Sequence, residues 1–282
     1  LLLNERGGIL DDTILLRLAA DEFLLVVNAG PRDSDFDWLA WHMPRSVTLE
    51  DRSQSWGKLD VQGPGSFVAL RPLVDAHLET LGYFHAVRAK CCGRQAIVSR
   101  TGYTGELGYE IFLPLEDVPA VFDELVSCEP VRPAGLGARD SLRLEMCYPL
   151  YGQDIDEETT PLEADLGRFV NLGREFMGVS ALRAVAAAGV RRRLVAFRAE
   201  TRRRAESGME IATPDGQAVG AVTSAAFAPS LGVSIAMGYV EAACAKSGAA
   251  MSIRHARGEL PVVQADKPLY KQGTCRTADL GS

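Results

Sequence analysis

Three short polar segments of the chain carry side chains that could do chemistry: Asn4–Asp12, Ser99–Ile111 and Gly135–Glu145. The first segment ends in two adjacent carboxylates, Asp11 and Asp12. A carboxylate that faces a pocket can accept a proton or stabilise a cation. Taken alone, a polar turn explains this pair more simply.

The second segment contains three glycines spaced by three residues, Gly102, Gly105 and Gly108. Glycines at this spacing let a backbone approach a flat ligand closely. Glu110 stands between Tyr109 and Ile111, so in a strand its side chain points away from theirs. That carboxylate either faces solvent or accepts two neighbouring N–H groups of a ligand.

In the third segment, Arg139 and Arg143 are four residues apart and share one face of a helix. One interpretation is a solvated face on which Arg139 pairs with Asp140 or Glu145. The other is an arginine that is offered to an anionic or carbonyl-bearing ligand.

Composition excludes several classes of protein. The 282 residues allow about two domains. A net charge of −7 disfavours a nucleic-acid binder, and no apolar stretch approaches the ~20 residues that span a bilayer. The four histidines are scattered, and the sequence lacks the spacings of zinc sites, phosphate loops and dinucleotide-binding loops. We therefore expect no metal, no nucleic acid and no membrane partner.

The pattern of apolar residues predicts an α+β region followed by an all-β region. Strands are expected at 13–18, 23–27, 84–89, 95–99 and 109–113, and helices at 33–43, 64–80, 115–126 and 138–146. After a linker helix at 184–188, short strands alternate with Gly, Pro and Asp-Gly turns. This alternation is typical of a barrel or jelly roll.

The three polar segments also carry a family resemblance. Together with six other runs, they resemble the aminomethyltransferase (T-protein) of the glycine cleavage system. The other runs are Val26–Ala29, Leu150–Ile155, Thr160–Ala164, Val219–Ser224, Phe227–Gly232 and Ile235–Val240. The match extends over nearly the whole chain.

The resemblance implies a ring of lobes with folate in a central channel. Two α+β lobes would occupy residues 1–190, one built from 1–52 with 84–154 and the other from 53–83 with 155–190. A β-barrel or jelly-roll lobe would occupy 191–282. Family members carry an additional stretch before the position that matches Leu1, so we expect the first lobe to be incomplete at its N-terminus.

The resemblance also implies site residues and partners. Asp12 matches the catalytic aspartate, Tyr103 and Glu110 match residues that face the pterin, and Arg139 matches a ligand-contacting arginine. Positions near the ligand correspond to Asn28 and Tyr270. The expected co-substrate is tetrahydrofolate with no metal, the expected partner is the lipoyl carrier protein (H-protein), and the expected location is the cytoplasm.

Two other functions are compatible with the resemblance. One is transfer of a methyl group to tetrahydrofolate from a sulfonium, methoxy or methylamine donor, although the run Asp11–Ile14 is closer to the glycine-cleavage members. The other is a folate-binding protein without transfer chemistry. That branch carries a Lys-Gly-Cys-Tyr motif near 173–176, where this chain has Gly-Arg-Glu-Phe.

Two arginine triplets, 191–193 and 202–204, reverse the sign of charge locally on an acidic protein. They are either solvated strand ends or a docking patch for the carrier protein.

Overall fold

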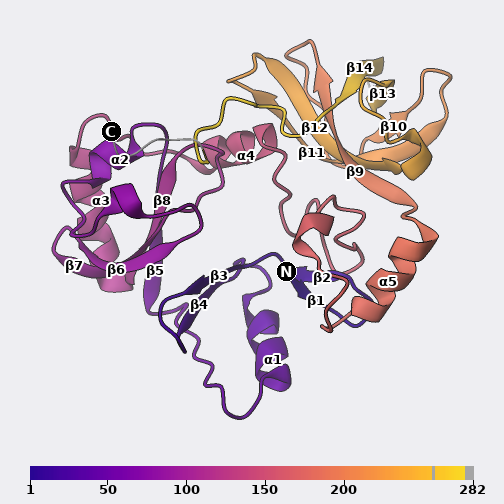
Figure 1. Ribbon diagram of the computed structural model, residues 1–282. Coiled ribbons are helices and arrows are strands. Elements are labelled where there is room, and N and C mark those ends of the chain that lie inside the picture. The colour runs from indigo at the N-terminus through magenta and orange to yellow at the C-terminus, as the bar shows by residue number, and fades with distance from the viewer. Residues whose placement is uncertain (256–257, 277–282) are drawn as a thin grey trace. The chain divides into compact units, whose positions relative to one another are not determined.

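A computed structural model describes residues 1–255 and 258–276 and shows a mixed α+β protein with a C-terminal barrel (Figure 1). The chain divides into two compact units. The first unit comprises Leu1–Thr13, Val27–Asp35 and Asp140–Lys271, and the second comprises Ile14–Val26, Phe36–Arg139 and Gln272–Ser282.

The second unit is built on a four-stranded antiparallel sheet in the order β5-β8-β7-β6. Its strands are β5 (Trp56–Gln62), β6 (Ala86–Cys91), β7 (Arg94–Ser99) and β8 (Gly108–Pro114). Alternate residues of β8 face one core, where Tyr109 and Ile111 pack with Val121 and Leu125 of helix α3 (Val118–Ser127). This face leaves Glu110 on the opposite side of the sheet, as its place in the sequence predicts.

A hairpin packs on that opposite side. Strands β3 (Ile14–Arg17) and β4 (Phe23–Val26) pair in an antiparallel manner, which confirms the two strands predicted at 13–18 and 23–27. Leu16 of β3 packs with Ile97 and Phe112 in a second, smaller core.

The helix predicted over 64–80 is mostly wrong. Only α2 (Ser66–Leu70) and a 3₁₀ turn at Leu78–Thr80 form there. Pro72 has no N–H to donate, so a helix cannot continue through it without losing a hydrogen bond. The strand β5 was not predicted, although Lys58 and Asp60 alternate with Leu59 and Val61 in the pattern of a half-buried strand.

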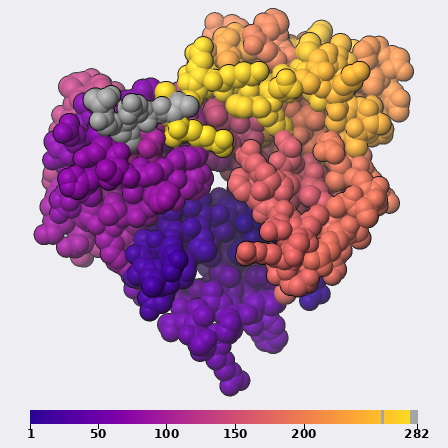
Figure 2. Space-filling model, in the orientation of Figure 1, coloured from indigo at the N-terminus to yellow at the C-terminus, as the bar shows by residue number. Residues whose placement is uncertain are grey.

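The first unit contains a closed six-stranded barrel in the order β10-β11-β12-β9-β14-β13. Most of the orange and yellow atoms in Figure 2 belong to it. Its strands are β9 (Arg192–Ala199), β10 (Glu210–Ala212), β11 (Ala218–Ala228), β12 (Val233–Glu241), β13 (Ala250–His255) and β14 (Gly258–Ala265). Phe197, Ala236 and Val240 fill the interior. Of the two predicted all-β forms, the barrel is the one that occurs.

Short elements complete the first unit. Strands β1 (Leu2–Leu3) and β2 (Ile9–Asp11) pair, and helix α5 (Val179–Ala188) precedes the barrel. Further 3₁₀ turns are Gly167–Phe169 and Ala242–Cys244 here, and Leu115–Asp117 in the second unit. Helices α1 (Arg32–His42) and α4 (Leu136–Glu145) both contain a unit boundary.

The described helices are all too short or too polar to cross a membrane. The predicted division into lobes at 1–190 and 191–282 stays a prediction.

Candidate active site

A tight turn places the two carboxylates of the first segment. The Asn4 side-chain oxygen accepts from the Gly8 amide at 2.9 Å, and its nitrogen donates to the Glu157 carbonyl at 3.0 Å. A Cβ at Gly8 would lie 1.8 Å from that same Glu157 oxygen, so only glycine fits. The amide of Ile9 then donates to the Thr159 carbonyl at 3.0 Å. Strand β2, which leads to Asp11, is therefore fixed against the segment 156–159.

Asn28 holds both carboxylates. Its backbone N–H donates to Asp11 Oδ2 at 2.9 Å, and its side-chain Nδ2 donates to Asp11 Oδ1 at 2.7 Å. The same Nδ2 lies 2.9 Å from Asp12 Oδ1. Asp11 is fully buried and Asp12 is half-buried. The simple turn interpretation is therefore wrong for this pair, because an exposed turn would not bury a carboxylate behind an amide clamp.

The pKa of Asp12 is raised to about 7, first by burial and second by the negative charge of Asp11. The hydrogen bond from Asn28 favours the charged form and works against this rise. A carboxyl with a pKa near neutrality can change its protonation state at little cost, which suits a group that handles protons or developing charge.

A second cluster of charged side chains surrounds Glu110 in the other unit. Glu110 is only 4% exposed, so the solvent-facing interpretation of the sequence is wrong. One of its oxygens forms an ion pair with Lys58, and the other accepts from the Thr101 hydroxyl. Both oxygens of Glu110 thus already have a protein donor.

Lys58 and Asp60 extend this cluster along strand β5. Lys58 Nζ lies 3.1 Å from Asp60 Oδ1, and Arg139 reaches Asp60 Oδ2 at 3.2 Å. Burial disfavours the charge on Lys58, but the carboxylates of Glu110 and Asp60 outweigh it and hold the pKa of Lys58 above its ordinary value. The Arg139 guanidinium lies 4.7 Å from the centre of the Tyr103 ring. The structure thus brings together three predicted residues, Tyr103, Glu110 and Arg139.

Lys58 and Asp60 were missed by sequence reasoning. The signal that could have found them is the alternation of charged and apolar residues along 58–62, which marks a strand with one polar face. Register places Asp60 directly opposite Glu110, so the strand pairing makes the cluster.

The glycines of the second segment accommodate a protein side chain. A Cβ at Gly102 or Gly108 would lie 2.0 Å from Gln62 Oε1. The Gln62 amide donates to the carbonyls of Thr101 at 3.1 Å and Tyr109 at 3.3 Å. The interpretation that these glycines admit a flat ligand is therefore corrected, because Gln62 fills the space beside two of them.

The two arginines of α4 have different partners. Arg143 is 1% exposed and forms a 2.6 Å ion pair with the buried Asp154. Its other nitrogen donates to Ser224 of β11 at 2.8 Å, and Ser224 in turn donates to Asp154 at 2.7 Å. A solvated face is therefore wrong for Arg143, whose buried network fastens α4 to the barrel.

Comparisons with known proteins agree over both parts of the chain. Residues 1–174 match the GCVT N-terminal domain, and residues 192–271 match the glycine cleavage T-protein C-terminal barrel domain. An aminomethyltransferase of Thermotoga petrophila is 40% identical over 273 residues, which cover 95% of this chain and 74% of the relative. The aminomethyltransferase of Synechococcus elongatus is 39% identical, over 96% of this chain and 74% of its own.

Solved structures give the same result. The crystal structure of glycine cleavage system aminomethyltransferase T from Bartonella henselae superposes with a TM-score of 0.87 at 33% identity, covering 97% of this chain and 75% of that one. The chain belongs to the glycine cleavage T-protein family. The resemblance stated from the sequence is therefore confirmed for family and fold.

Tyr270 is the remaining predicted residue of this T-protein-family chain. Its backbone N–H donates to the Glu145 carbonyl at the end of α4, at 2.9 Å. The neighbouring Leu269 packs against the outer face of the barrel with Leu144 and Cys147. The backbone of this segment is thus fixed, and a ligand-binding role for the Tyr270 side chain stays a prediction.

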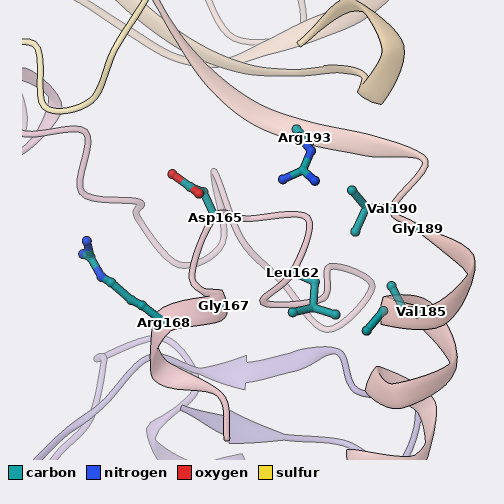
Figure 3. A pocket seen from close by; sticks show the side chains of 9 residues that line it. Leu162, Asp165, Gly167, Arg168, Val185, Gly189, Val190 and Arg193 are labelled. Atoms are coloured by element: carbon teal, nitrogen blue, oxygen red, sulfur yellow. The ribbon is translucent and has the colours of Figure 1, made fainter. Parts of the chain in front are cut away.

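A cavity of about 390 Å³ lies elsewhere in the first unit (Figure 3). Its walls include Leu162, Asp165, Arg168, Val185, Val190 and Arg193. None of the predicted site residues lines it, so we assign no part of the T-protein chemistry to it. Within residues 1–255 and 258–276, no group of three or more His, Cys, Asp or Glu side chains is arranged to hold a metal ion.

Proposed function

We propose that the chain is a tetrahydrofolate-dependent aminomethyltransferase of glycine cleavage. It takes the aminomethyl group from a lipoyl carrier protein and produces 5,10-methylenetetrahydrofolate, ammonia and the dihydrolipoyl carrier. In this reaction the transferred carbon loses its bonds to sulfur and to the amino nitrogen and gains bonds to two folate nitrogens. The two protons that leave those nitrogens end on the thiol and the ammonia. The observation that carries the proposal is the Asp11–Asp12–Asn28 arrangement in a chain of this family.

Asp12 is the proposed catalytic group, in its carboxylate form. As the transferred carbon loses a bonding partner it gains positive charge, which a nearby carboxylate stabilises. The same carboxylate can accept a proton from a folate nitrogen. With a pKa of about 7, Asp12 is ionised in a large fraction of molecules at neutral pH and still basic enough to take a proton.

Glu110, Tyr103 and Arg139 are the proposed pterin-binding residues. The pterin edge offers an N–H beside an amino group, and each carboxylate oxygen of Glu110 keeps acceptor capacity beyond its present partner. Tyr103 supplies an aromatic ring, and Arg139 can donate to a carbonyl. Asn28 positions Asp12, and Tyr270 is proposed to lie near the ligand.

The test is a reconstituted transfer assay. The protein is incubated with tetrahydrofolate and an aminomethylated lipoyl carrier protein, and ammonia and methylenetetrahydrofolate are measured. Production of both in equal amounts supports the proposal. Production of methyltetrahydrofolate from a sulfonium, methoxy or methylamine donor would support a methyltransferase instead, and folate binding without turnover would support a non-catalytic binding protein. The lipoyl carrier as partner and the cytoplasm as location remain predictions.

A further inference from the structure

A third aspartate lies against the carboxylate pair of the first unit. Asp35, in the first turn of α1, is 2% exposed, and its carboxyl is hydrogen-bonded to that of Asp11. Asp11 itself is fully buried. Two carboxyl groups in direct contact and out of water cannot both carry a full charge without a large energetic cost, so such pairs retain a proton.

The hydrogen bonds indicate which member of the pair carries the proton. Asp11 accepts two N–H groups from Asn28, at 2.9 and 2.7 Å, and these stabilise its charged form. Asp35 Oδ2 is buried and accepts from no protein N–H or O–H group, so nothing comparable stabilises a charge on it. A charge is therefore better placed on Asp11, and the proton on Asp35, whose O–H donates to Asp11.

We infer that Asp35 is a positioning residue that shares one proton with Asp11. The shared proton sets the charge of the Asp11–Asp35 pair and holds Asn28 in place against Asp12. The inference rests on the proposed function for its catalytic meaning, but not for the protonation itself. With Asp35 neutral, the pair carries one negative charge. Through Asn28, whose Nδ2 lies within hydrogen-bond distance of both Asp11 and Asp12, that charge is held at a fixed position beside Asp12.

Within the part of the chain that the structure describes, other titratable groups also act on or near the pair. Burial, then the hydrogen bond with Asp11 and the charge of Asp11, raise the pKa of Asp35. Tyr151 lies nearby, and burial first and then the charge of Asp11 raise its pKa. Glu157 and Asp156 also act on Tyr151. Asp35 has no arginine or lysine among these neighbours to stabilise its charged form.

The experiment measures protonation directly and does not require turnover. The full chain is labelled with ¹³C at the aspartate carboxyl carbons, and its spectra are recorded from about pH 4 to about pH 9, a range that extends well above the ordinary aspartate pKa of about 3.9. The variants Asp35→Asn, Asp35→Leu and Asp12→Asn identify the two signals by their loss. Asp37→Asn, an exposed aspartate of the same helix, is the matched control. The expected result is that Asp35→Asn removes a signal that is still protonated at about pH 6.

The two Asp35 variants then show whether Asp35 is neutral and shares its proton with Asp11, or carries a second negative charge. Asparagine keeps a neutral donor, so the Asp12 signal in Asp35→Asn should titrate at the same pH as in the parent. Leucine removes the donor and leaves the Asp11 charge less stabilised, so Asp12 should titrate at higher pH, and kcat in the transfer assay should fall about tenfold to a hundredfold as the clamp shifts.

Three outcomes would overturn the inference. In the first, the signal that Asp35→Asn removes is already ionised at about pH 6. In the second, Asp12 titrates at lower pH in Asp35→Asn than in the parent, which would show that Asp35 was charged. In the third, Asp35→Leu folds and has the same Asp12 titration and the same kcat as the parent. A parent chain with no transfer activity but with the protonated Asp35 signal would contradict the proposed function and still support the shared proton.

Discussion

Asp12 is the side chain whose replacement should lower turnover most. Asp12→Asn keeps the shape but removes the charge, and loss of such help typically costs about 10²–10⁴ in rate. Tetrahydrofolate affinity should stay within a few fold, because Asp12 is proposed to act on the reacting carbon. In the parent, kcat should fall as pH drops through about 7, since protonation removes the carboxylate. Near-normal turnover of Asp12→Asn would remove this role.

The same raised pKa predicts an effect on stability that is independent of activity. Folded Asp12 binds its proton more tightly than the unfolded chain does, so its contribution to the free energy of unfolding falls as pH rises from about 4 to about 7. Asp12→Asn has no titrating group at this position, so its stability does not undergo this fall. Its melting temperature should therefore exceed that of the parent above pH 7, and the difference should disappear near pH 4. Thermal melts across this range measure it, and a constant difference at every pH would contradict the raised pKa.

Glu110 should control folate affinity. Glu110→Gln replaces two acceptors by one acceptor and one donor, and loss of a charge-assisted hydrogen bond costs about 1.5–3 kcal/mol, or roughly tenfold to a hundredfold in Kd. Lys58→Met is the matched comparison, because it removes the present partner of Glu110 and keeps the carboxylate. Calorimetric titration with tetrahydrofolate should show weaker binding for Glu110→Gln and no weakening for Lys58→Met. Unchanged affinity in Glu110→Gln would make Glu110 a structural partner of Lys58 alone.

At the scale of elements, the turn before β2 should be intolerant of any side chain. Gly8→Ala would place its Cβ 1.8 Å from the Glu157 carbonyl oxygen, a backbone atom that cannot rotate away. The forced shift should cost about 1–3 kcal/mol and move Asp11 and Asp12 with the strand. The control is Gly137→Ala in α4, where a Cβ meets nothing within 4 Å, and which should be neutral or stabilising by up to about 1 kcal/mol. Equal melting temperatures for the two variants would contradict the close packing of this turn.

Local patterns in the sequence were enough to predict the elements that repeat a period. The hairpin 14–26, helices α3 and α4 and most barrel strands follow from alternation or helical spacing. The prediction of a helix over 64–80 was wrong because the apolar pattern continues through Pro72, whereas helical hydrogen bonding cannot continue through a residue without an N–H. Boundaries also moved, since α1 spans Arg32–His42 where a helix at 33–43 was predicted.

Partners distant in sequence could not be predicted in this way. Glu110 meets Lys58 only because β5 and β8 pair in register, and Gln62 fills the space beside Gly102 and Gly108 for the same reason. Asp35 has the same local sequence signature as its exposed neighbours Asp33 and Asp37, and only the fold buries it. A sequence shows which groups can carry charge, whereas tertiary packing decides which of those charges are desolvated.

At the scale of the whole molecule, the remaining sequence feature is the pair of arginine triplets on an acidic chain. The structure separates their members. Arg192 Nε forms an ion pair with Glu163 Oε1 at 3.1 Å, and the Arg192 guanidinium lies 4.5 Å from the centre of the Tyr239 ring. Arg202 is exposed over the Phe227 ring, and Arg203 is half-buried with one nitrogen 3.3 Å from the Gly258 carbonyl. The second triplet therefore keeps charge at the surface of the barrel.

If this surface receives an acidic lipoyl carrier protein, electrostatic steering should speed their encounter. Reversing Arg202 and Arg203 to Glu should then raise the KM for the carrier and leave tetrahydrofolate affinity unchanged. The difference in carrier KM between the parent and this variant should disappear at high salt, because the Debye length shrinks to about 3 Å at about 1 M. Reversal of the exposed Arg45 and Arg71 gives the same net charge on other surface and serves as the control. Carrier titrations at low and high salt that give all three proteins the same KM and the same salt dependence would show that the triplet is only a solvated strand end.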